Sequence, residues 1–417
     1  MELKRAVITG MGALTPLGNT LEEYWANLVA GKSGAAPITH FDASKFKTQF
    51  ACEVKNFNPE DHFDRKEARK LDPYAQYALV TATEAWTDSG LSEDAIDNDR
   101  AGVIWGSGIG GLKTFYDECT EFAGGDGTPR FNPFFIPKMI ADIAAGHISM
   151  KWNLRGPNFA TVSACASSTN SLIDSFNYIR LGHADIIVAG GSEAAVNQAG
   201  VGGFNAMKAL SQRNDSPETA SRPFDLERDG FVLGEGAGCL IVEELEHALA
   251  RGAKIYAEIV GGGMSADAHH ITAPHPEGLG AINVMRNALR DAGMKPSEID
   301  YINVHGTSTP LGDIAESKAI REVFGEDAFD LNISSTKSMT GHLLGAAGAI
   351  ETIACVMSIK DSIVPPTINH TTDDPQFNPR LNFTFNKAQK REVNAALSNT
   401  FGFGGHNASV IVKKFIQ

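Results

Sequence analysis

The feature that most constrains the fold of this chain is an internal repeat whose two copies lie 203 residues apart. The segments 88–97 and 291–300 share one pattern: aspartate, a small residue, glycine, an apolar residue, four variable positions, isoleucine and aspartate. Each copy follows an amphipathic pattern that predicts a helix, over residues 77–87 and 281–290. Each copy also precedes an apolar strand that ends in a glycine-rich turn. Chance similarity is the alternative, and a duplicated domain is the interpretation that we adopt.

The starts and ends of the two halves correspond as well. A strand followed by a glycine turn is expected at residues 6–12 and again at 257–263. The same pattern recurs at residues 184–191 and 395–405. Because strands and helices alternate within each half, the sequence predicts an α/β fold with mixed or parallel sheets covered by helices.

We expect the first half to span residues 1–250, with insertions, and the second to span residues 251–417. The segment 211–238 is rich in turn residues but is not of low complexity. The halves are therefore expected to pack as one rigid body rather than to be joined by a flexible linker.

Charge and cysteine usage restrict the classes of function. A net charge of −14 argues against general nucleic-acid binding, although one local basic patch can still meet an acidic partner. The five cysteines are an odd number without a C-x-x-C pair, which favours a reducing compartment over a disulfide framework. No apolar run reaches the roughly 18 residues of a membrane helix, and the chain opens on a strand pattern rather than a signal peptide. We expect a cytoplasmic protein without membrane or nucleic-acid partners.

Cys165 is the strongest candidate for a reactive group. It lies in T-V-S-A-C-A-S-S, where small neighbours leave its sulfur room for an incoming carbonyl carbon, and a helix is expected to begin beside it. A helix N-terminus and a nearby imidazole would lower the pKa of the thiol from its usual ~8.5. A buried structural cysteine is the ordinary fate of a free cysteine, so Cys165 alone does not decide the function.

Two histidines in glycine-rich settings strengthen the case for acyl chemistry. His305 ends an apolar strand in V-H-G-T-S-T-P, and His342 lies in K-S-M-T-G-H-L-L-G before a helix expected over residues 343–357. Lys337 precedes His342 by one short loop. A core histidine bonded to backbone is the alternative for His305, and a solvated surface charge is the alternative for Lys337. Two imidazoles beside a sulfur would stabilise negative charge as it develops there.

Several other patterns have weaker meanings. The glycine turn F-G-F-G-G-H-N from Phe401 can point backbone N–H groups at a reacting oxygen, or be an ordinary turn. The segment 106–111 matches G-x-G-x-x-G, but no acidic strand end follows it, so dinucleotide binding is disfavoured. His269, His270 and His275 lack partners at metal-ligand spacing and indicate a polar loop. The basic segment 64–70 is either a solvated helix face or a docking site for an acidic partner.

Four motifs together resemble the β-ketoacyl-[acyl-carrier-protein] synthases, in particular the elongating type II enzymes of bacterial fatty-acid synthesis. They are S-A-C-A at Cys165, H-G-T-S-T-P-L-G-D from His305, K-S-M-T-G-H-L-L-G-A-A-G from Lys337, and the segment from Arg222-Pro-Phe-Asp to Gly238. The resemblance covers essentially the whole chain. It implies the thiolase fold, a five-layered α-β-α-β-α duplication of two similar halves, and a homodimer.

The resemblance also implies roles for individual residues. Cys165 would be the acylated nucleophile, His305 and His342 the catalytic pair, and Lys337 the residue that orients the surroundings of His342. The backbone N–H groups of Cys165 and Phe403 would form the oxyanion hole, with Phe403 gating the pocket.

Further residues are implied in groups. A supporting shell would comprise Asp313, Glu316 and Glu351. The phosphopantetheine arm and the acyl chain would be bound by Thr307, Thr309, Thr272, Phe403 and Ile109. An acidic acyl carrier protein would dock on Lys66, Arg69, Lys70, Arg130 and Lys208.

The implied reaction is a decarboxylative Claisen condensation. Cys165 takes an acyl chain from acyl carrier protein, malonyl carrier loses carbon dioxide, and the resulting carbanion extends the chain by two carbons. No metal or redox cofactor is implied. The presence of two histidines argues against initiating synthases, which carry asparagine at the second position, and against thiolases, which use a second cysteine. A polyketide-type ketosynthase, a cysteine acyl hydrolase and a non-enzymatic partner subunit are the rival interpretations.

Overall fold

The repeat marks equivalent helix ends in the two halves of the computed structural model, which describes residues 3–92 and 96–416. Helix α3 (Pro73–Ser89) ends at Gly90 and α10 (Leu279–Ala292) ends at Gly293, with φ angles of 68° and 63°. Each of these glycines is the glycine of one copy of the repeat. The repeat has glycine at this position because a left-handed helix cap favours glycine. Both helices are longer than predicted. Residues 93–95 of the first copy lie outside the described residues.

The aspartate that opens each copy has the same structural partner. The Asp88 carboxylate accepts a hydrogen bond from Met11 N at 3.0 Å, and Asp291 accepts one from Gly262 N at 2.9 Å. Met11 and Gly262 lie in the first strand of their halves, β1 (Ala6–Leu14) and β8 (Ala257–Ala266). Each aspartate thus fastens the end of a helix to the first strand of its own half.

The strands of the two halves have the same order in a ten-stranded sheet, β10-β9-β13-β14-β8-β1-β7-β6-β4-β5. Counted outward from the centre, the first half gives β1-β7-β6-β4-β5 and the second gives β8-β14-β13-β9-β10. Strands β4 and β9 pair in parallel with both of their neighbours, and the inner pairs are antiparallel. The halves join where residues 6–8 of β1 pair with residues 257–259 of β8. The remaining strand bounds are β4 (Ala101–Gly106), β5 (Asn158–Thr161), β6 (Ile186–Glu193), β7 (Gly236–Glu244), β9 (Tyr301–Asn303), β10 (Asn332–Ser334), β13 (Ala395–Gly402) and β14 (His406–Lys413).

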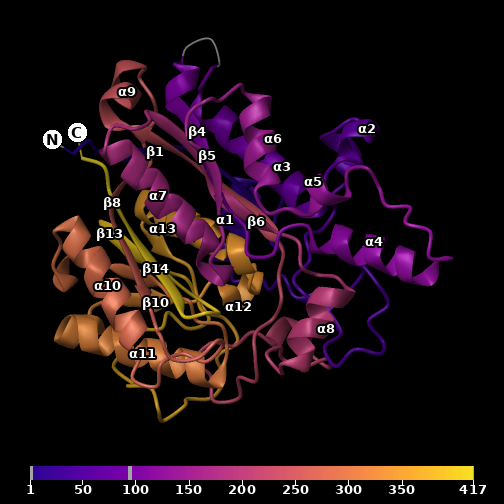
Figure 1. The fold of residues 1–417 in the computed structure, drawn as a ribbon. Helices are drawn as coiled ribbons and strands as arrows, with labels where there is room; N and C mark the ends of the chain where they lie inside the picture. Colours follow the sequence, from indigo (N-terminus) through magenta and orange to yellow (C-terminus); the bar gives the residue numbers. More distant parts are fainter. Residues whose placement is uncertain (1–2, 93–95, 417) are drawn as a thin grey trace.

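Helices complete five layers (Figure 1). Helices α7 (Ser167–Arg180) and α13 (Ala347–Asp361) lie in the middle and contact strands of both halves. Helix α3 and α6 (Ile143–Lys151) cover the outer face of the first half, and α10 and α11 (Pro310–Phe324) cover that of the second. Separate apolar clusters fill the middle layer and the two outer layers. The predicted five-layered α/β duplication is confirmed.

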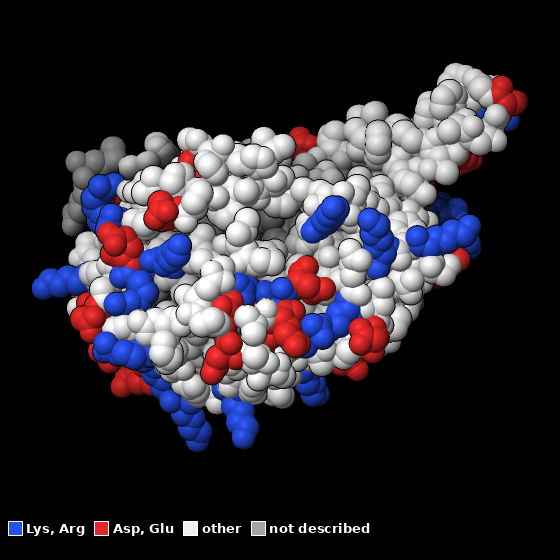
Figure 2. Space-filling model, turned by 90° about the horizontal axis from the view of Figure 1, so that it is seen from below, with Lys and Arg blue, Asp and Glu red and all other residues white. Residues whose placement is uncertain are grey.

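The other elements lie around this frame. Helix α4 (Leu112–Gly124) projects from the body (Figure 1), and a mostly uncharged projection is visible on the same side in Figure 2. No helix in residues 3–92 and 96–416 is long and apolar enough to span a membrane. The remaining bounds are α1 (Leu21–Val29), α2 (Arg65–Ala68), α5 (Phe135–Met139), α8 (Gln198–Ala206), α9 (Leu245–Ala250), α12 (Lys337–Thr340), β2 (Ala36–Pro37), β3 (Phe50–Ala51), β11 (Ile363–Val364) and β12 (Gln389–Lys390).

Candidate active site

Cys165 lies in a sharp turn at the start of the central helix α7. The turn is a short 3-10 helix, η4 (Ala164–Ala166), and Ala164 has a left-handed φ of 51°. Ser167 secures the turn: its hydroxyl donates to Ala164 O at 2.7 Å and accepts from Ser163 N at 3.0 Å. The small residues around the cysteine therefore shape a strained turn as well as leaving room for the sulfur. Cys165 itself is 7% exposed.

His342 lies directly against the sulfur, with its Nε2 3.0 Å from Cys165 Sγ. Backbone hydrogen bonds fix its position: His342 N donates to Val232 O at 2.7 Å, and Gly234 N donates to His342 O at 2.9 Å. The turn-rich segment 211–238 of the first half thus holds His342 of the second half beside Cys165.

His305 completes the group from the end of β9. Its ring centroid lies 5.2 Å from that of His342, and the two rings are nearly perpendicular, at 88°. Glu316 holds the backbone of this turn, since its two carboxylate oxygens accept from His305 N and Gly306 N, both at 2.8 Å. The structure therefore brings together the three groups that the sequence singled out.

A buried ion pair lies behind the histidines. Lys337 is 1% exposed and Glu351 is 0% exposed, and the ammonium of Lys337 donates to the Glu351 carboxylate. The surface-charge alternative for Lys337 is wrong. Burial raises the pKa of Glu351 to about 7, and the charge on Lys337 opposes that rise.

Burial and the nearby ammonium keep both imidazoles neutral. Burial lowers the pKa of His305 and of His342 well below the usual value, and the charge on Lys337 lowers both further. A neutral imidazole can accept a proton at one nitrogen and donate one from the other. The pair is thus suited to proton transfer and to hydrogen bonding with a carbonyl oxygen.

The expectation of a lowered pKa for Cys165 is wrong for the resting site. Burial raises its pKa to about 12, because a thiolate loses its hydration there, and the charge on Lys337 and the N–H of Phe403 only partly oppose this. The resting group is a thiol, which can donate its proton to His342 Nε2 across the 3.0 Å contact.

The glycine turn after β13 approaches Cys165 closely. A Cβ on Gly402 would lie 2.7 Å from Ser163 O and 3.1 Å from Cys165 N, so glycine is required for this approach. Gly404 and Gly405 continue the turn with φ angles of 88° and 74°. The turn thereby brings the N–H of Phe403 to the Cys165 sulfur.

These groups open into a cavity of about 650 Å³. Thr307 and Thr309 lie on one wall with their hydroxyl oxygens 3.1 Å apart, and Thr272 also lines the cavity. Ile109, from the segment that resembles a dinucleotide motif, lies on the wall as well. The polar loop that carries His270 and His275 also lines the cavity. Further apolar wall residues are Phe204, Met207, Phe231, Leu344, Phe401 and Phe403.

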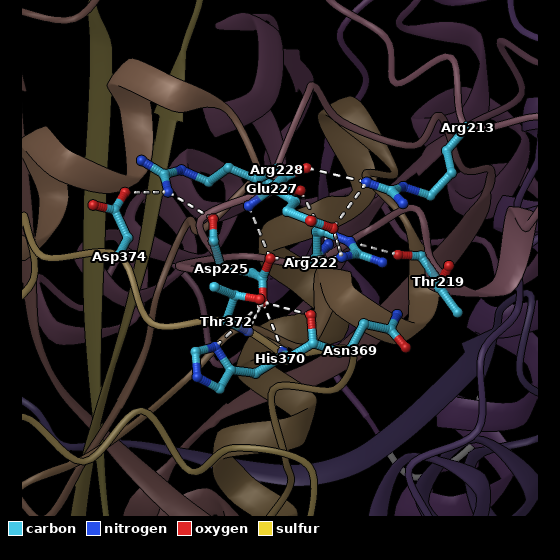
Figure 3. Close-up of polar contacts among 12 residues, drawn as sticks. Arg213, Thr219, Arg222, Asp225, Glu227, Arg228, Asn369, His370, Thr372 and Asp374 are labelled. Atoms are coloured by element: carbon cyan, nitrogen blue, oxygen red, sulfur yellow. Dashed lines mark hydrogen bonds and ion pairs between the residues drawn. The ribbon is translucent and has the colours of Figure 1, made fainter.

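The turn-rich segment 211–238 also braces the turn that carries Thr307 and Thr309, a role that its motif did not reveal. Figure 3 shows Arg228 of this segment paired with Asp374. Arg228 is buried and pairs with Asp374 at 2.8 Å, and it faces Asp313 at 3.6 Å. Its guanidinium also donates to Thr309 O at 3.3 Å and to Pro310 O at 3.0 Å. Two buried aspartates at one arginine are the signal for such a brace, but they lie far apart in the sequence.

Asp313 and Glu316 accept hydrogen bonds from backbone N–H groups, whereas Glu351 pairs with Lys337. Asp313 accepts from Phe224 N at 3.0 Å, and burial raises its pKa to about 6. Burial likewise raises the pKa of Glu316 to about 7, while the N–H groups of residues 305 and 306 oppose it. Both acids lie in the first two turns of α11, and through these backbone contacts they hold residues 224, 305 and 306 in place.

The predicted docking cations are all exposed. Lys208 lies on the cavity wall. Lys70 lies over the ring of Phe134 at 5.7 Å, and Arg130 pairs with Asp126 at 3.8 Å. Lys66 and Arg69 lie at helix α2. Within the part of the chain that the structure describes, no group of three or more His, Cys, Asp or Glu side chains is placed to hold a metal ion.

Comparisons with known proteins agree with this geometry. Residues 4–248 match the family model of the β-ketoacyl synthase N-terminal domain, and residues 256–371 match that of the C-terminal domain. The chain is 49% identical over 417 residues to 3-oxoacyl-[acyl-carrier-protein] synthase 2 of Coxiella burnetii, which covers 99% of both chains. It is 51% identical over 412 residues to the protein of that name in Staphylococcus aureus, again covering 99% of both chains.

Solved structures agree as well. A β-ketoacyl synthase from Burkholderia phymatum is 36% identical with a TM-score of 0.92, covering 99% of this chain and all of that one. A chain from a type II polyketide ketosynthase in complex with its acyl-carrier protein is 34% identical, with a TM-score of 0.90 and coverage of 99% and 100%.

Proposed function

This chain belongs to the β-ketoacyl synthase family, and from that premise we propose that it elongates fatty acyl chains with Cys165 as the acylated nucleophile. It is an acyltransferase of the condensing type. The observation that carries the assignment of residues is the 3.0 Å contact between His342 Nε2 and Cys165 Sγ, with His305 beside them, in a cavity lined largely by apolar side chains.

In the first half-reaction, the Cys165 thiol attacks the thioester carbonyl of acyl carrier protein. His342 Nε2 takes the thiol proton as the S–C bond forms, and then delivers it to the departing pantetheine thiolate. The negative oxygen of the intermediate is bound by the N–H groups of Cys165 and Phe403. The raised pKa of the thiol makes this assistance necessary, because few thiolates exist before the substrate arrives.

In the second half-reaction, malonyl carrier binds with its arm along Thr307, Thr309 and Thr272. Its carboxylate leaves as carbon dioxide, and the electron pair remains as an enolate whose oxygen accepts from the neutral imidazoles of His305 and His342. The carbanion attacks the acyl thioester, the bond to Cys165 sulfur breaks, and the released thiolate takes up one proton from solvent. Loss of carbon dioxide drives the step, so the chemistry requires neither a metal nor a redox cofactor.

The proposed partner is an acidic acyl carrier protein that docks on Lys66, Arg69, Lys70, Arg130 and Lys208. All five are exposed, and Lys208 stands at the cavity that the arm must enter.

The free state of all five cysteines suits a reducing compartment, and we place the reaction in the cytoplasm. We assign the boundary between the duplicated halves to residues 250 and 251, between α9 and β8.

We infer that two copies associate through the outer edge of the first half. Strand β5 ends the sheet order, and its unpaired edge needs a cover. A groove beside it is lined by Ile143 and Phe159, and Val162 is 62% exposed. Sedimentation should give a species of twice the 44.5 kDa chain mass, and a monomer at micromolar concentration would contradict the inference. The nearby projection adds exposed apolar side chains, namely Phe115, Phe122, Phe131, Phe134, Ile136 and Ile140.

A polyketide-type ketosynthase is the second candidate, because one structural relative is bound to a hexaketide. That relative is 34% identical to this chain. The two proteins named 3-oxoacyl-[acyl-carrier-protein] synthase 2 are 49% and 51% identical to it over 99% of both chains. Fatty-acid elongation is therefore favoured.

The test incubates the purified chain with acyl carrier substrates of several lengths and with malonyl carrier. Mass spectrometry should find the acyl group on Cys165 and a product two carbons longer after one turnover. Repeated extension without reduction would favour the polyketide activity. Release of free acid without condensation would favour the hydrolase.

A further inference from the structure

The strained turn that carries Cys165 has a counterpart in the second half. The 3-10 helix η8 (Leu344–Ala346) leads into α13 as η4 leads into α7. Leu344 has a left-handed φ of 47°, close to the 51° of Ala164. Gly345 therefore takes the place of Cys165 in a second turn of the same shape, and the two turns contact each other. We call them the Cys165 turn and the Gly345 turn.

Each turn is faced by a strand end from the other half. Strand β13 and its glycine turn face the Cys165 turn, and β6 faces the Gly345 turn. The strands correspond, because Ile186 of β6 lies opposite Ala101, which begins β4, and Ala396 of β13 lies opposite Tyr301, which begins β9. Counting along both strands places Glu193 where the second half has Phe403.

The Glu193 carboxylate fills the Gly345 turn. Its Oε2 accepts from Gly345 N at 3.0 Å and from Gly108 N at 2.8 Å. Its Oε1 accepts from Ser107 Oγ at 3.1 Å and from Ile109 N at 3.2 Å. Glu193 is 0% exposed and Ser107 is also buried, so these donors would lose their acceptor in a largely dry place if the carboxylate were absent.

Two glycines make room for this carboxylate. A Cβ on Gly345 would lie 2.7 Å from Glu193 Oε2 and 2.3 Å from Gly108 N. A Cβ on Gly108 would lie 2.9 Å from the same carboxylate oxygen. The second half therefore has glycine where the first has its nucleophile, because the anion that this turn binds is a side chain of the protein itself.

The contacts reach two parts of the active site. Ile109, which lines the cavity, is held at its backbone by one carboxylate oxygen. Gly345, held by the other, follows His342 by three residues, and Leu344 between them also lines the cavity. We propose that Glu193 is a positioning residue that fixes the Ile109 wall against the His342 turn and thereby limits the length of acyl chain that is elongated. The proposal rests on the proposed condensing activity.

The test compares condensation rates for a long and a short acyl carrier substrate at pH 8, where the carboxylate is charged. Glu193→Gln keeps one oxygen and replaces the other by an amide NH2 group. That group cannot accept from the two donors that it faces, so the segment 107–111 is held less firmly. We expect the ratio of kcat/KM for the long chain to that for the short chain to rise about tenfold, the change that ~1.4 kcal/mol produces. Ser107→Ala removes one donor to Glu193 and also the acceptor of Gly110 N at 3.0 Å, and it should shift the ratio in the same direction by less.

Glu84→Gln is the matched control, because Glu84 also accepts from two backbone N–H groups, Ala13 N at 2.8 Å and Leu21 N at 2.7 Å. Glu84 does not line the cavity, so its variant should keep the wild-type ratio. A wild-type ratio in both Glu193→Gln and Ser107→Ala overturns the proposal. If Glu193→Gln does not fold, Ser107→Ala decides alone. If the wild-type chain itself does not condense, the proposed function fails instead.

Discussion

At Cys165 and at Gly345 the chain makes the same strained turn at the start of a central helix, yet the two turns hold different things. The first carries a thiol and opens into the cavity. The second carries no side chain and accommodates the carboxylate of Glu193. The difference teaches that the duplicated backbone supplies an anion-binding turn twice. The side chains then decide whether a substrate oxygen or a resident carboxylate is bound there.

The comparison also explains why the first turn is a credible oxyanion site. In the second turn the N–H of Gly345, the counterpart of Cys165, binds a negative oxygen at 3.0 Å. Geometry that binds a carboxylate oxygen in one copy is suited to bind a developing oxyanion in the other. What the first turn adds is a sulfur beside it and His342 at 3.0 Å from that sulfur.

The largest effect is expected when the thiol of the Cys165 turn is removed, because the Gly345 turn has no side chain at this position. Cys165→Ala should reduce elongation by about 10⁴-fold or more, since the covalent intermediate cannot form. The melting temperature should stay close to that of the wild type, because the turn is held by backbone and by Ser167.

Cys52→Ala is the control for the loss of a buried thiol, as Cys52 is also buried and free but lies outside the cavity lining. Normal elongation by the Cys165 variant would remove Cys165 from the mechanism.

A second change removes the imidazole of His342, which contacts the sulfur of the Cys165 turn. His342→Asn should reduce condensation by about 10²–10⁴-fold, because the enolate loses one of two hydrogen-bond donors and the thiol loses its base. Acylation of Cys165 should fall less, since solvent can accept the thiol proton at high pH. Mass spectrometry of the acyl-enzyme separates the two steps, and equal losses in both would argue for a different division of labour.

The smallest expected effect is on the pH dependence of stability. It tests whether the carboxyl group of Glu193 in the Gly345 turn has a raised pKa. Burial raises the pKa of Glu193 to about 7 from its ordinary 4.5, although the N–H groups of Gly108, Gly345 and Ile109 oppose the rise. The folded state therefore binds this proton more tightly than the unfolded state. The resulting stabilisation is complete below the unfolded pKa and is lost as the pH rises through about 7.

Between pH 6 and pH 8, Glu193 should thus lower the free energy of unfolding by about 1 kcal/mol. Urea titrations of Glu193→Gln should show a pH dependence weaker by that amount. Burial raises the pKa of Glu84 only to about 6, so Glu84→Gln should weaken the pH dependence over this range by less. An unchanged pH dependence in the Glu193 variant would contradict the raised pKa.

Several parts of the fold and site could be predicted because they depend on local sequence. The repeat identified two halves, since Gly90 and Gly293 are helix caps and Asp88 and Asp291 have equivalent partners. The helix after Cys165 and the strand before His305 follow from apolar periodicity. The family motifs then indicated the three groups that the structure brings together.

Other parts depend on contacts between distant segments. The pKa of Cys165 was expected to fall because a helix N-terminus and an imidazole are near, but burial outweighs both and raises it. The sequence does not reveal the roles of Glu193 and Arg228, because their partners lie far away in the sequence. A glutamate at the end of an apolar strand has no local feature that predicts four hydrogen-bond donors around its carboxylate.

By itself, the sequence determined the duplication, the layered α/β class and the candidate reactive groups, because helix caps, strand periodicity and motif chemistry are local properties. Only the tertiary structure decided that His342 touches the sulfur, that the thiol is protonated at rest and that a carboxylate occupies the second turn. These depend on desolvation and on hydrogen bonds across the interface of the halves, which exist only once the two halves have packed together.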